Sequence, residues 1–360
     1  MKQFTRTDIE RLLAENIPVI EKKFLYIMGG GNTTQLFQEG LQREFFYNQI
    51  KGYTNSNPEN WGKEIFGKPC VSPESLAGQK DVLVLINTPQ PAFIKEMKQK
   101  LSELNVAHCL MEEAILKNHA NEVLDVYDML FDQTSKDIYA NMLRCRLNGE
   151  YPDCDLITKD QYFCWADFTN KNTGSSFVDC GAYVGDSIER YIWYKDGVVN
   201  KIWGFEPDPN NYNAMQKRIE RLKEEWNLSD EKINLLPYGV SSESSKGVVQ
   251  EYSNNNGLGS KIMQGNIEGG KEIKIVALDD VINEKIDFLK ADIESYELKM
   301  LLGAEKTIKK YQPCVAVCIY HNSTDFYSIP LLLKRMMPEA RMAVRHHSNT
   351  LADTVLYAWT

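Results

Sequence analysis

The stretch Phe177-Val-Asp-Cys-Gly-Ala-Tyr-Val-Gly-Asp-Ser187 decides the fold of the C-terminal half of the chain. Its first residues predict the end of a buried strand, and Asp179-x-Gly181-x-x-x-Gly185 predicts a sharp turn. Glycine is needed where the backbone turns tightly or must approach a ligand closely. The helix expected from Gly185 to about residue 194 offers free amides and a positive dipole end to an anion. The stretch therefore predicts a ligand site at the carboxyl end of a strand.

Alternating strands and helices continue from this turn to the end of the chain. We expect strands at residues 201–206, 233–240, 286–292, 313–321, 341–347 and 354–359. Helices are expected at residues 210–226, 296–311 and 328–336. Five parallel strands closed by a hairpin predict an α/β fold with a mixed seven-stranded, Rossmann-like sheet, in which one antiparallel strand is inserted near an edge.

Glu206 closes the second of these strands, about 20 residues after the glycine turn. A carboxylate there can accept hydrogen bonds from both hydroxyls of a ribose, as in the dinucleotide-binding fold. Pro207 follows directly and stiffens the loop that holds Glu206. The glycine turn and the acid at the ends of consecutive strands together predict a nucleoside site.

The chemistry of the turn favours S-adenosyl-L-methionine as its ligand. The helix N-terminus suits a carboxylate, and Asp179 suits an ammonium or a sulfonium, whereas a pyrophosphate would be poorly served by an acid. NAD sites carry GxGxxG instead. The predicted cofactor-binding residues are Asp179, Gly181, Tyr183, Gly185, Asp186, Ser187, Glu206 and Pro207.

Several motifs, in this order, resemble those of the FkbM-type methyltransferases over about residues 155–360. They are residues 177–187, Phe205-Glu-Pro-Asp-Pro209, Val276-Ala-Leu-Asp-Asp280, Phe288-Leu-Lys-Ala-Asp-Ile-Glu294, Ile319-Tyr-His321 and Arg345-His-His-Ser348. The resemblance implies the class I methyltransferase fold, S-adenosylmethionine as donor and usually a hydroxyl acceptor, often on a sugar or a polyketide-like product. This chain has Ser295-Tyr296 where the family usually has Gly-Ala, which could reshape the acceptor pocket.

Asp292 and His321 are the candidate catalytic residues, because they end the fourth and fifth strands, where open α/β sheets bind ligands. An alcohol is a poor nucleophile, so a general base worth about 10²–10⁴-fold is expected. We expect one of the two to accept the acceptor's proton and the other to orient the substrate.

Other readings of the neighbouring residues stay open. Asp292, Glu294 and His321 could hold a divalent metal. We favour Glu294 as an acid near the first turn of the next helix, and assign no metal. His346 and His347 are consecutive strand residues, so at most one of them faces the cleft.

The N-terminal third predicts a smaller Rossmann-like α/β domain. We expect a leading helix at residues 5–16, strands at 23–28, 45–53, 81–86 and 106–111, and a helix at 91–104. The expected domains are residues 1–112, a helical connector at 113–160, and the methyltransferase domain at 161–360.

The motif Gly29-Gly-Gly-Asn-Thr-Thr34 is a partial dinucleotide fingerprint. Its last glycine is missing, and Tyr53-Thr-Asn55 stands where an acidic residue is expected. We therefore favour a scaffold, dimerisation or acceptor-recognition role for this domain over a bound nucleotide, and a homodimer through it is one expectation.

The composition of the chain indicates which partners it can bind and in which cell compartment it is expected. The net charge of −9 argues against a broad electrostatic grip on nucleic acid or anionic lipid. No apolar run reaches the roughly 20 residues that span a bilayer, and the N-terminus lacks the apolar core of a signal peptide. We expect a cytoplasmic protein without a disulfide scaffold.

The polar section 241–271 predicts hairpins or a lid. Residues 254–260 within it either cover the substrate or form a plain loop.

These observations predict an S-adenosylmethionine-dependent O-methyltransferase acting on a sugar, glycan or small hydroxylated metabolite. The alternative is a non-catalytic module that binds adenosylmethionine or a nucleotide. The presence of Asp179, Gly181, Gly185 and Glu206 together favours the enzyme, because a module released from cofactor binding has no need of all four. An NAD-dependent sugar enzyme is less favoured, because its fingerprint is incomplete.

Overall fold

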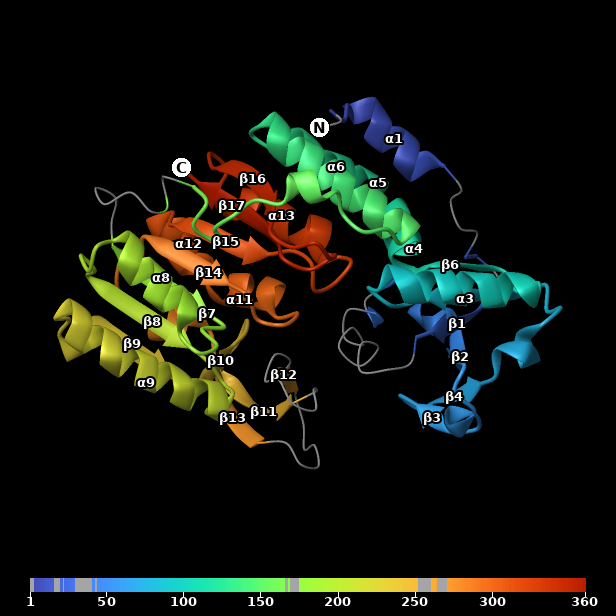
Figure 1. The fold of residues 1–360 in the computed structure, drawn as a ribbon, viewed down its shortest axis with the longest axis horizontal. Helices are drawn as coiled ribbons and strands as arrows, with labels where there is room; N and C mark the ends of the chain where they lie inside the picture. The colour runs from blue at the N-terminus through green and yellow to red at the C-terminus, as the bar shows by residue number, and fades with distance from the viewer. Residues whose placement is uncertain are drawn as a thin grey trace.

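The structure is a computed structural model that describes residues 3–15, 20–21, 23–29, 41–42, 44–165, 168, 175–251, 260–263 and 271–360. A six-stranded, a four-stranded and a seven-stranded sheet are formed by these residues. Figure 1 shows the small N-terminal sheet at one end of the molecule and the large sheet at the other, with helices joining them.

The large sheet has the order β16-β17-β15-β14-β7-β8-β9. Its strands are β7 (Ser176–Cys180), β8 (Lys201–Phe205), β9 (Ile233–Leu236), β14 (Phe288–Ala291), β15 (Cys314–Cys318), β16 (Arg341–His346) and β17 (Thr354–Trp359). β15, β14, β7, β8 and β9 run parallel, and β17 is antiparallel to both β15 and β16. The predicted mixed seven-stranded α/β fold is confirmed.

Helices cover both faces of this sheet, because its strands are apolar on both sides. Alternate residues of β7 show the two faces: Phe177 packs in one core with Ile188 and Met215, whereas Val178 packs in another with Met300. The helices are α8 (Asp186–Tyr194), α9 (Pro209–Trp226), α10 (Leu278–Val281), α11 (Glu297–Gly303), α12 (Glu305–Tyr311) and α13 (Asp325–Met336).

The single strand expected at residues 233–240 is wrong, because the chain divides at Pro237 into β9 and β10 (Tyr238–Val240). Proline has no amide to donate to a sheet ladder. β10 joins the four-stranded sheet β10-β13-β11-β12, built with β11 (Ser245–Glu251), β12 (Ser260–Met263) and β13 (Lys271–Val276). β11 and β12 form an antiparallel pair within the section expected to form hairpins or a lid, while residues 254–259 lie outside the described residues.

The single helix expected at residues 296–311 is also wrong, since α11 and α12 meet at Ala304. The reason lies in a distant acid. The Asp279 carboxylate accepts hydrogen bonds from the amides of Lys306 (3.0 Å) and Thr307 (2.9 Å) and so caps a second helix start.

The N-terminal sheet has the order β3-β4-β2-β1-β5-β6, with β3 antiparallel to the rest. Its strands are β1 (Phe24–Met28), β2 (Ile50–Thr54), β3 (Glu64–Ile65), β4 (Lys68–Val71), β5 (Val82–Ile86) and β6 (His108–Leu110), with helix α3 (Pro91–Glu103) after β5. The smaller α/β unit is confirmed, although the short β3 and β4 were not expected. Of the glycine motif, Gly29 is described, and residues 30–34 lie outside the described residues.

Three helices, α4 (Met111–Asn118), α5 (Ala120–Met129) and α6 (Gln133–Asn148), connect the two sheets. α6 packs on β16 and α5 on α13. The leading helix α1 (Arg6–Ala14) lies beside α5 rather than on the N-terminal sheet, as Figure 1 shows. One hydrophobic core therefore joins residues far apart in the sequence, from Ile9 through Tyr139 to Val344. The domain limits at 112 and 160 stay predictions.

The connector also covers the free edge of the large sheet. The amides of Phe131 and Thr158 each donate a 2.7 Å hydrogen bond to β16, to the carbonyls of Met342 and His346. The amide of Val344 donates to Ser135 Oγ at 3.0 Å. Within the described part of the chain, no helix has the length and apolar character that crossing a membrane requires.

Candidate functional site

The glycine turn follows β7 and touches the end of β14. Gly181 has a φ of +79°, and a Cβ added there would lie 1.9 Å from the carbonyl oxygen of Asp292. Gly185, with a φ of +81°, is the N-cap of α8, and no side chain caps this helix end. Glycine is therefore required at position 181 both by the backbone conformation and by the close contact with β14.

Glu206 is held against the same turn. Its Oε2 accepts a 2.9 Å hydrogen bond from the amide of Tyr183, and its Oε1 accepts one of 2.9 Å from the amide of Asp208. The residue is buried, and this burial raises the pKa of Glu206 to about 7. A carboxylate has about four acceptor positions, so each oxygen can still accept from a ligand hydroxyl.

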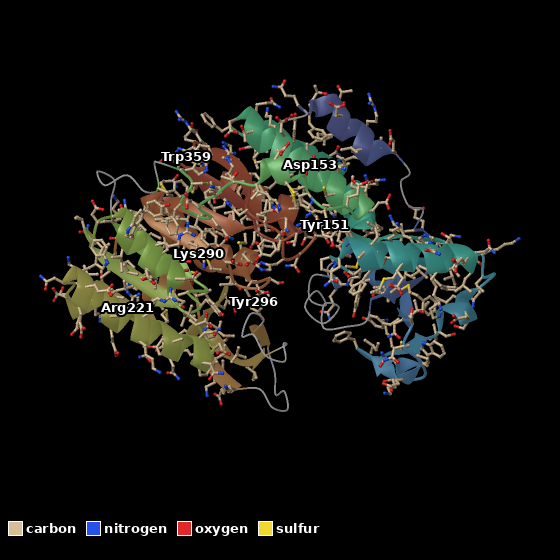
Figure 2. The ribbon with its side chains drawn as sticks, viewed as in Figure 1. Tyr151, Asp153, Arg221, Lys290, Tyr296 and Trp359 are labelled. Atoms are coloured by element: carbon tan, nitrogen blue, oxygen red, sulfur yellow. The ribbon has the colours of Figure 1, made fainter. Side chains whose placement is uncertain are left out.

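Asp179 is fully buried, and its partner in the structure is a residue that the sequence analysis did not single out. Lys290 Nζ lies 2.9 Å from Asp179 Oδ1 and donates to the carbonyl of Gly181 at 2.7 Å. Figure 2 shows Lys290 in the interior of the large domain. Burial lowers the pKa of Lys290, but the Asp179 carboxylate outweighs it and raises that pKa, so the ammonium stays charged. The ligand-facing role predicted for Asp179 stays a prediction.

The other predicted cofactor-binding residues lie around the turn and differ in how exposed they are to solvent. Ser187 is buried, Tyr183 and Pro207 are half-buried, and Asp186 is exposed at the first turn of α8. With Gly181 and Glu206, they line the carboxyl ends of the neighbouring strands β7 and β8, where a ligand is expected.

Asp292 lies between this turn and the end of β15. Tyr162 Oη donates a 2.6 Å hydrogen bond to Asp292 Oδ2, and Tyr320 Oη donates one of 3.2 Å to Oδ1. His321 Nε2 lies 3.5 Å from Oδ1. Burial opposes ionisation, but His321 and Lys290 outweigh it and lower the pKa of Asp292. The carboxylate is thus ionised near neutral pH, and two tyrosines fix its orientation.

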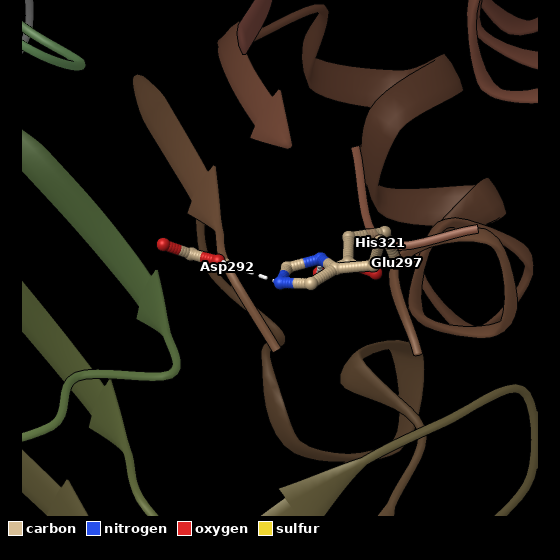
Figure 3. Close-up of side chains that lie close together, drawn as sticks. All are labelled: Asp292, Glu297 and His321. Atoms are coloured by element: carbon tan, nitrogen blue, oxygen red, sulfur yellow. Dashed lines mark ion pairs between the residues drawn. The ribbon is translucent and has the colours of Figure 1, made fainter. Parts of the chain in front are cut away.

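His321 is enclosed by carboxylates. Its Nδ1 lies 2.8 Å from Glu297 Oε1, and its Nε2 lies 3.7 Å from Glu294 Oε2. Figure 3 shows the imidazole between Asp292 and Glu297. Burial lowers the pKa of His321, but Glu297 and Glu294 outweigh it and raise that pKa to about 10. His321 is therefore an imidazolium near neutral pH.

The same cluster has the residue types of a metal site. Asp292, Glu297 and His321 present ligand atoms that all lie within 4.8 Å of one another. Glu297, rather than the Glu294 of the sequence-based alternative, completes this group. The absence of a metal from the predicted site residues stays a prediction.

The two residues that replace the family's Gly-Ala have separate consequences. Ser295 has a φ of +80° and follows Glu294 at +53°, so the position that favours glycine carries a strained serine. Tyr296 is buried in a small core with Val249 and Ile273 of the four-stranded sheet. The tyrosine therefore packs away from the cavity described next, and it does not reshape that cavity.

A cavity of about 310 Å³ lies beside His321. Glu294, Tyr320 and His321 line it from the large sheet. It lies at the carboxyl ends of β14 and β15, where parallel α/β sheets bind ligands.

His346 and His347 both pack inside the protein. His346 Nδ1 hydrogen-bonds Thr354 Oγ1 at 3.0 Å, and the two nitrogens of His347 hydrogen-bond the carbonyl of Thr158 (2.8 Å) and Tyr357 Oη (2.9 Å). Burial lowers the pKa of each histidine to about 4. Neither residue lines the cavity beside His321.

The strand order, the glycine turn and Glu206 define a class I methyltransferase fold, and sequence comparison gives the same class. The methyltransferase FkbM domain matches residues 179–347. This match to the FkbM methyltransferase domain supports a methyltransferase. No curated protein matches the chain in sequence.

Solved structures extend the likeness of the fold beyond the matched domain. Methyltransferase FkbM from Methylobacillus flagellatus KT is similar over 98% of this chain and 97% of its own, with 19% identity and a TM-score of 0.57. An rRNA methylase from Streptococcus thermophilus matches 56% of this chain and 96% of its own, with 15% identity and a TM-score of 0.34. The first comparison shows that the N-terminal unit belongs to a fold shared with another protein.

Proposed function

We propose that this protein is an S-adenosylmethionine-dependent O-methyltransferase that methylates a hydroxyl group of a sugar, glycan or small metabolite. The observation that carries the proposal is the contact between Gly181 and Asp292. The glycine turn of the predicted cofactor site packs on the backbone of the residue whose side chain meets His321. Cofactor turn and acid–base pair thus lie side by side.

The residues present fit S-adenosylmethionine. Glu206 is a buried carboxylate with acceptor capacity left, the end of α8 has no side-chain cap, and the contact at Gly181 leaves no room for a Cβ. Glu206 would accept from the ribose hydroxyls, and the amides at the start of α8 would meet the carboxylate. S-adenosylmethionine would supply a methyl group bound to a sulfonium. Its transfer would form a C–O bond to the acceptor and break the C–S bond, and the acceptor would lose its proton.

The charges of the two candidate catalytic residues support a different task for each of them. His321 carries a proton near neutral pH and cannot take another, whereas Asp292 is ionised. We therefore propose that Asp292 receives the acceptor's proton and that His321 holds Asp292 and the acceptor oxygen in place. Tyr162 keeps the carboxylate oriented through its 2.6 Å hydrogen bond.

Calorimetric titration with S-adenosylmethionine tests the cofactor site. We expect the wild type to bind and Glu206→Ala to bind more weakly by about 1.5–3 kcal/mol, the scale of a charged hydrogen bond. Glu225→Ala, which removes an exposed acid on α9, is the matched control and should bind normally. Equal affinity in Glu206→Ala and wild type would remove Glu206 from the site.

Methyl incorporation into a panel of sugars and hydroxylated metabolites tests the reaction. Asp292→Asn should lose about 10²–10⁴-fold in kcat, the usual contribution of a general base. His321→Gln should lose activity too, and unchanged turnover would remove His321 from the mechanism. Binding of S-adenosylmethionine without transfer to any acceptor would instead support a non-catalytic binding module.

We also propose a cytoplasmic location for the protein. Its eight cysteines are free thiols, which is compatible with a reducing compartment.

A further inference from the structure

We propose that the cavity beside His321 is the acceptor site, that the N-terminal sheet forms its second half, and that it takes a compact, largely apolar, uncharged molecule bearing a hydroxyl. This inference rests on the proposed function, because it names the acceptor class of that same reaction. It assigns the N-terminal domain to substrate recognition.

The cavity lies at the carboxyl ends of both sheets. Asn87, which follows β5, and Met111, which follows β6, line it from the N-terminal sheet. Tyr320 and His321, which follow β15, line it from the large sheet. Ligands of open α/β sheets bind beyond the carboxyl ends of the strands. In this protein the carboxyl ends of strands from both sheets face the same cavity. Its volume of about 310 Å³ is within the range of small-molecule sites.

Asn87 lies at the topological switch point of the N-terminal sheet, where successive strands are added on opposite sides of β1. β2 lies on one side of β1 and β5 on the other, and the amide of Asn87 donates to the carbonyl of Met28 at 2.8 Å. Such a switch point is where ligands of doubly wound sheets bind. Asn87 is therefore placed at the binding position of its own sheet and, at the same time, in the wall of the shared cavity.

Three buried polar atoms in the wall have no hydrogen-bond partner within the described structure. They are Glu44 Oε2, Asn87 Nδ2 and Arg146 Nε, on residues that are 6%, 8% and 2% exposed. All three residues line the cavity. A buried polar group without a partner is costly, so a ligand that supplies partners for these atoms gains affinity. One or two hydroxyls or a carbonyl would satisfy them.

The charges of the wall favour an uncharged acceptor over an anionic one. Arg146 donates to Glu112 Oε1 at 3.0 Å, and His321 lies 2.8 Å from Glu297, so the cations among the described lining residues each already lie on a carboxylate. Glu294 adds a further acidic group to the wall. A phosphate or a nucleotide-activated sugar would meet carboxylates there instead of a free cation.

Apolar side chains make up much of the remaining wall. Met111 and Ile115 lie on the N-terminal side, and Leu351 lies on the turn between β16 and β17. A few convergent polar groups in an otherwise apolar wall are typical of sites for small, weakly polar ligands. A ring or short hydrocarbon carrying the hydroxyl fits this wall, with the hydroxyl directed toward His321 and toward Asp292, whose Oδ1 lies 3.5 Å from His321 Nε2.

Binding of 2-naphthol and of 2-naphthyl phosphate to the full-length protein, with and without S-adenosylhomocysteine, tests the proposal. We expect 2-naphthol to bind and its phosphate ester to bind at least about 10-fold more weakly. Asn87→Leu should weaken 2-naphthol about 3- to 10-fold, as expected for one hydrogen bond. Ala352→Trp, which places an indole in the cavity, should abolish its binding. Ala92→Trp, on the exposed face of α3, is the matched control and should change nothing.

Each result has one meaning. Absent binding of 2-naphthol, equal or tighter binding of the phosphate ester, or unchanged affinity in Ala352→Trp would overturn the proposal. A wild type that binds 2-naphthol in the expected pattern but binds no S-adenosylmethionine would keep the cavity and refute the proposed methyl donor. The acceptor site and the cofactor site can thus fail separately.

Discussion

Lys290 and Asp179 form a fully buried ion pair of 2.9 Å on the neighbouring strands β14 and β7. The same ammonium donates to the carbonyl of Gly181, so one side chain ties both strands to the glycine turn. The turn is therefore positioned by charge as well as by backbone geometry.

Removing one partner of this pair should be far more damaging than removing both. Lys290→Met leaves the Asp179 carboxylate buried without compensation, and we expect a loss of about 3–5 kcal/mol in the free energy of unfolding. The double variant Lys290→Met/Asp179→Leu should recover much of that loss. Urea denaturation of the three proteins measures it. A loss below about 1 kcal/mol in the single variant would contradict the buried pair.

Gly181→Ala should cost more than backbone strain alone. Both Gly181 (φ +79°) and Gly78 (φ +74°) are left-handed, but a Cβ at Gly78 meets nothing within 4 Å. Gly78→Ala is thus the matched control, with an expected loss of about 1–2 kcal/mol and unchanged S-adenosylmethionine affinity. Gly181→Ala should lose more stability and bind the cofactor at least about 10-fold more weakly. Equal behaviour of the two variants would show that the contact with Asp292 does not matter.

His321 should make stability depend on pH in a defined direction. Its pKa is about 10 in the folded protein, above the value of about 6.5 expected for an unfolded chain. The stabilisation from the imidazolium is therefore complete below about pH 6.5 and is lost as the pH rises toward 10. The difference in unfolding free energy between wild type and His321→Gln should shrink over this range. A difference that grows with pH would refute the charged histidine.

Chelation should leave methyl transfer unchanged. Asp292, Glu297 and His321 could coordinate a cation, but the raised pKa of His321, about 10, favours the imidazolium, which cannot coordinate a metal through a protonated nitrogen. We expect equal activity before and after dialysis against EDTA, and no metal in the purified protein by mass spectrometry. Activity that is lost on dialysis and restored by Mg²⁺ or Mn²⁺ would show instead that the cluster is a metal centre.

The sequence predicted those parts of the site that are determined by residues close together in the chain. The turn at Gly181 and the acid at Glu206 are each signalled by glycine spacing and by the end of an apolar run. Their proximity follows because parallel neighbouring strands end at one edge of a sheet. The same rule explains why Asp292 and His321, which follow the neighbouring strands β14 and β15, lie 3.5 Å apart.

Long-range partners could not be predicted in this way. Tyr162 reaches Asp292 across 130 residues of sequence, and no local pattern marks it. Lys290 gave a faint signal, as a charge inside the apolar strand Phe288–Ala291, since a buried lysine requires a partner. The break at Ala304 depends on Asp279, which lies 27 residues before Lys306, and the motif that contains Asp279 does not indicate that it caps a helix.

The hydrogen bonds that the connector makes to β16 bear on whether the edge of the large sheet can pair with another chain. An uncovered outer strand presents unpaired amides and carbonyls that can template pairing with another chain. A shortened chain starting at residue 161 would bare the outer side of Met342 and His346, where Phe131 and Thr158 now bind. The connecting segments at Phe131 and Thr158 thus close an edge at which the large sheet could otherwise pair with a second chain, and removing them should favour self-association.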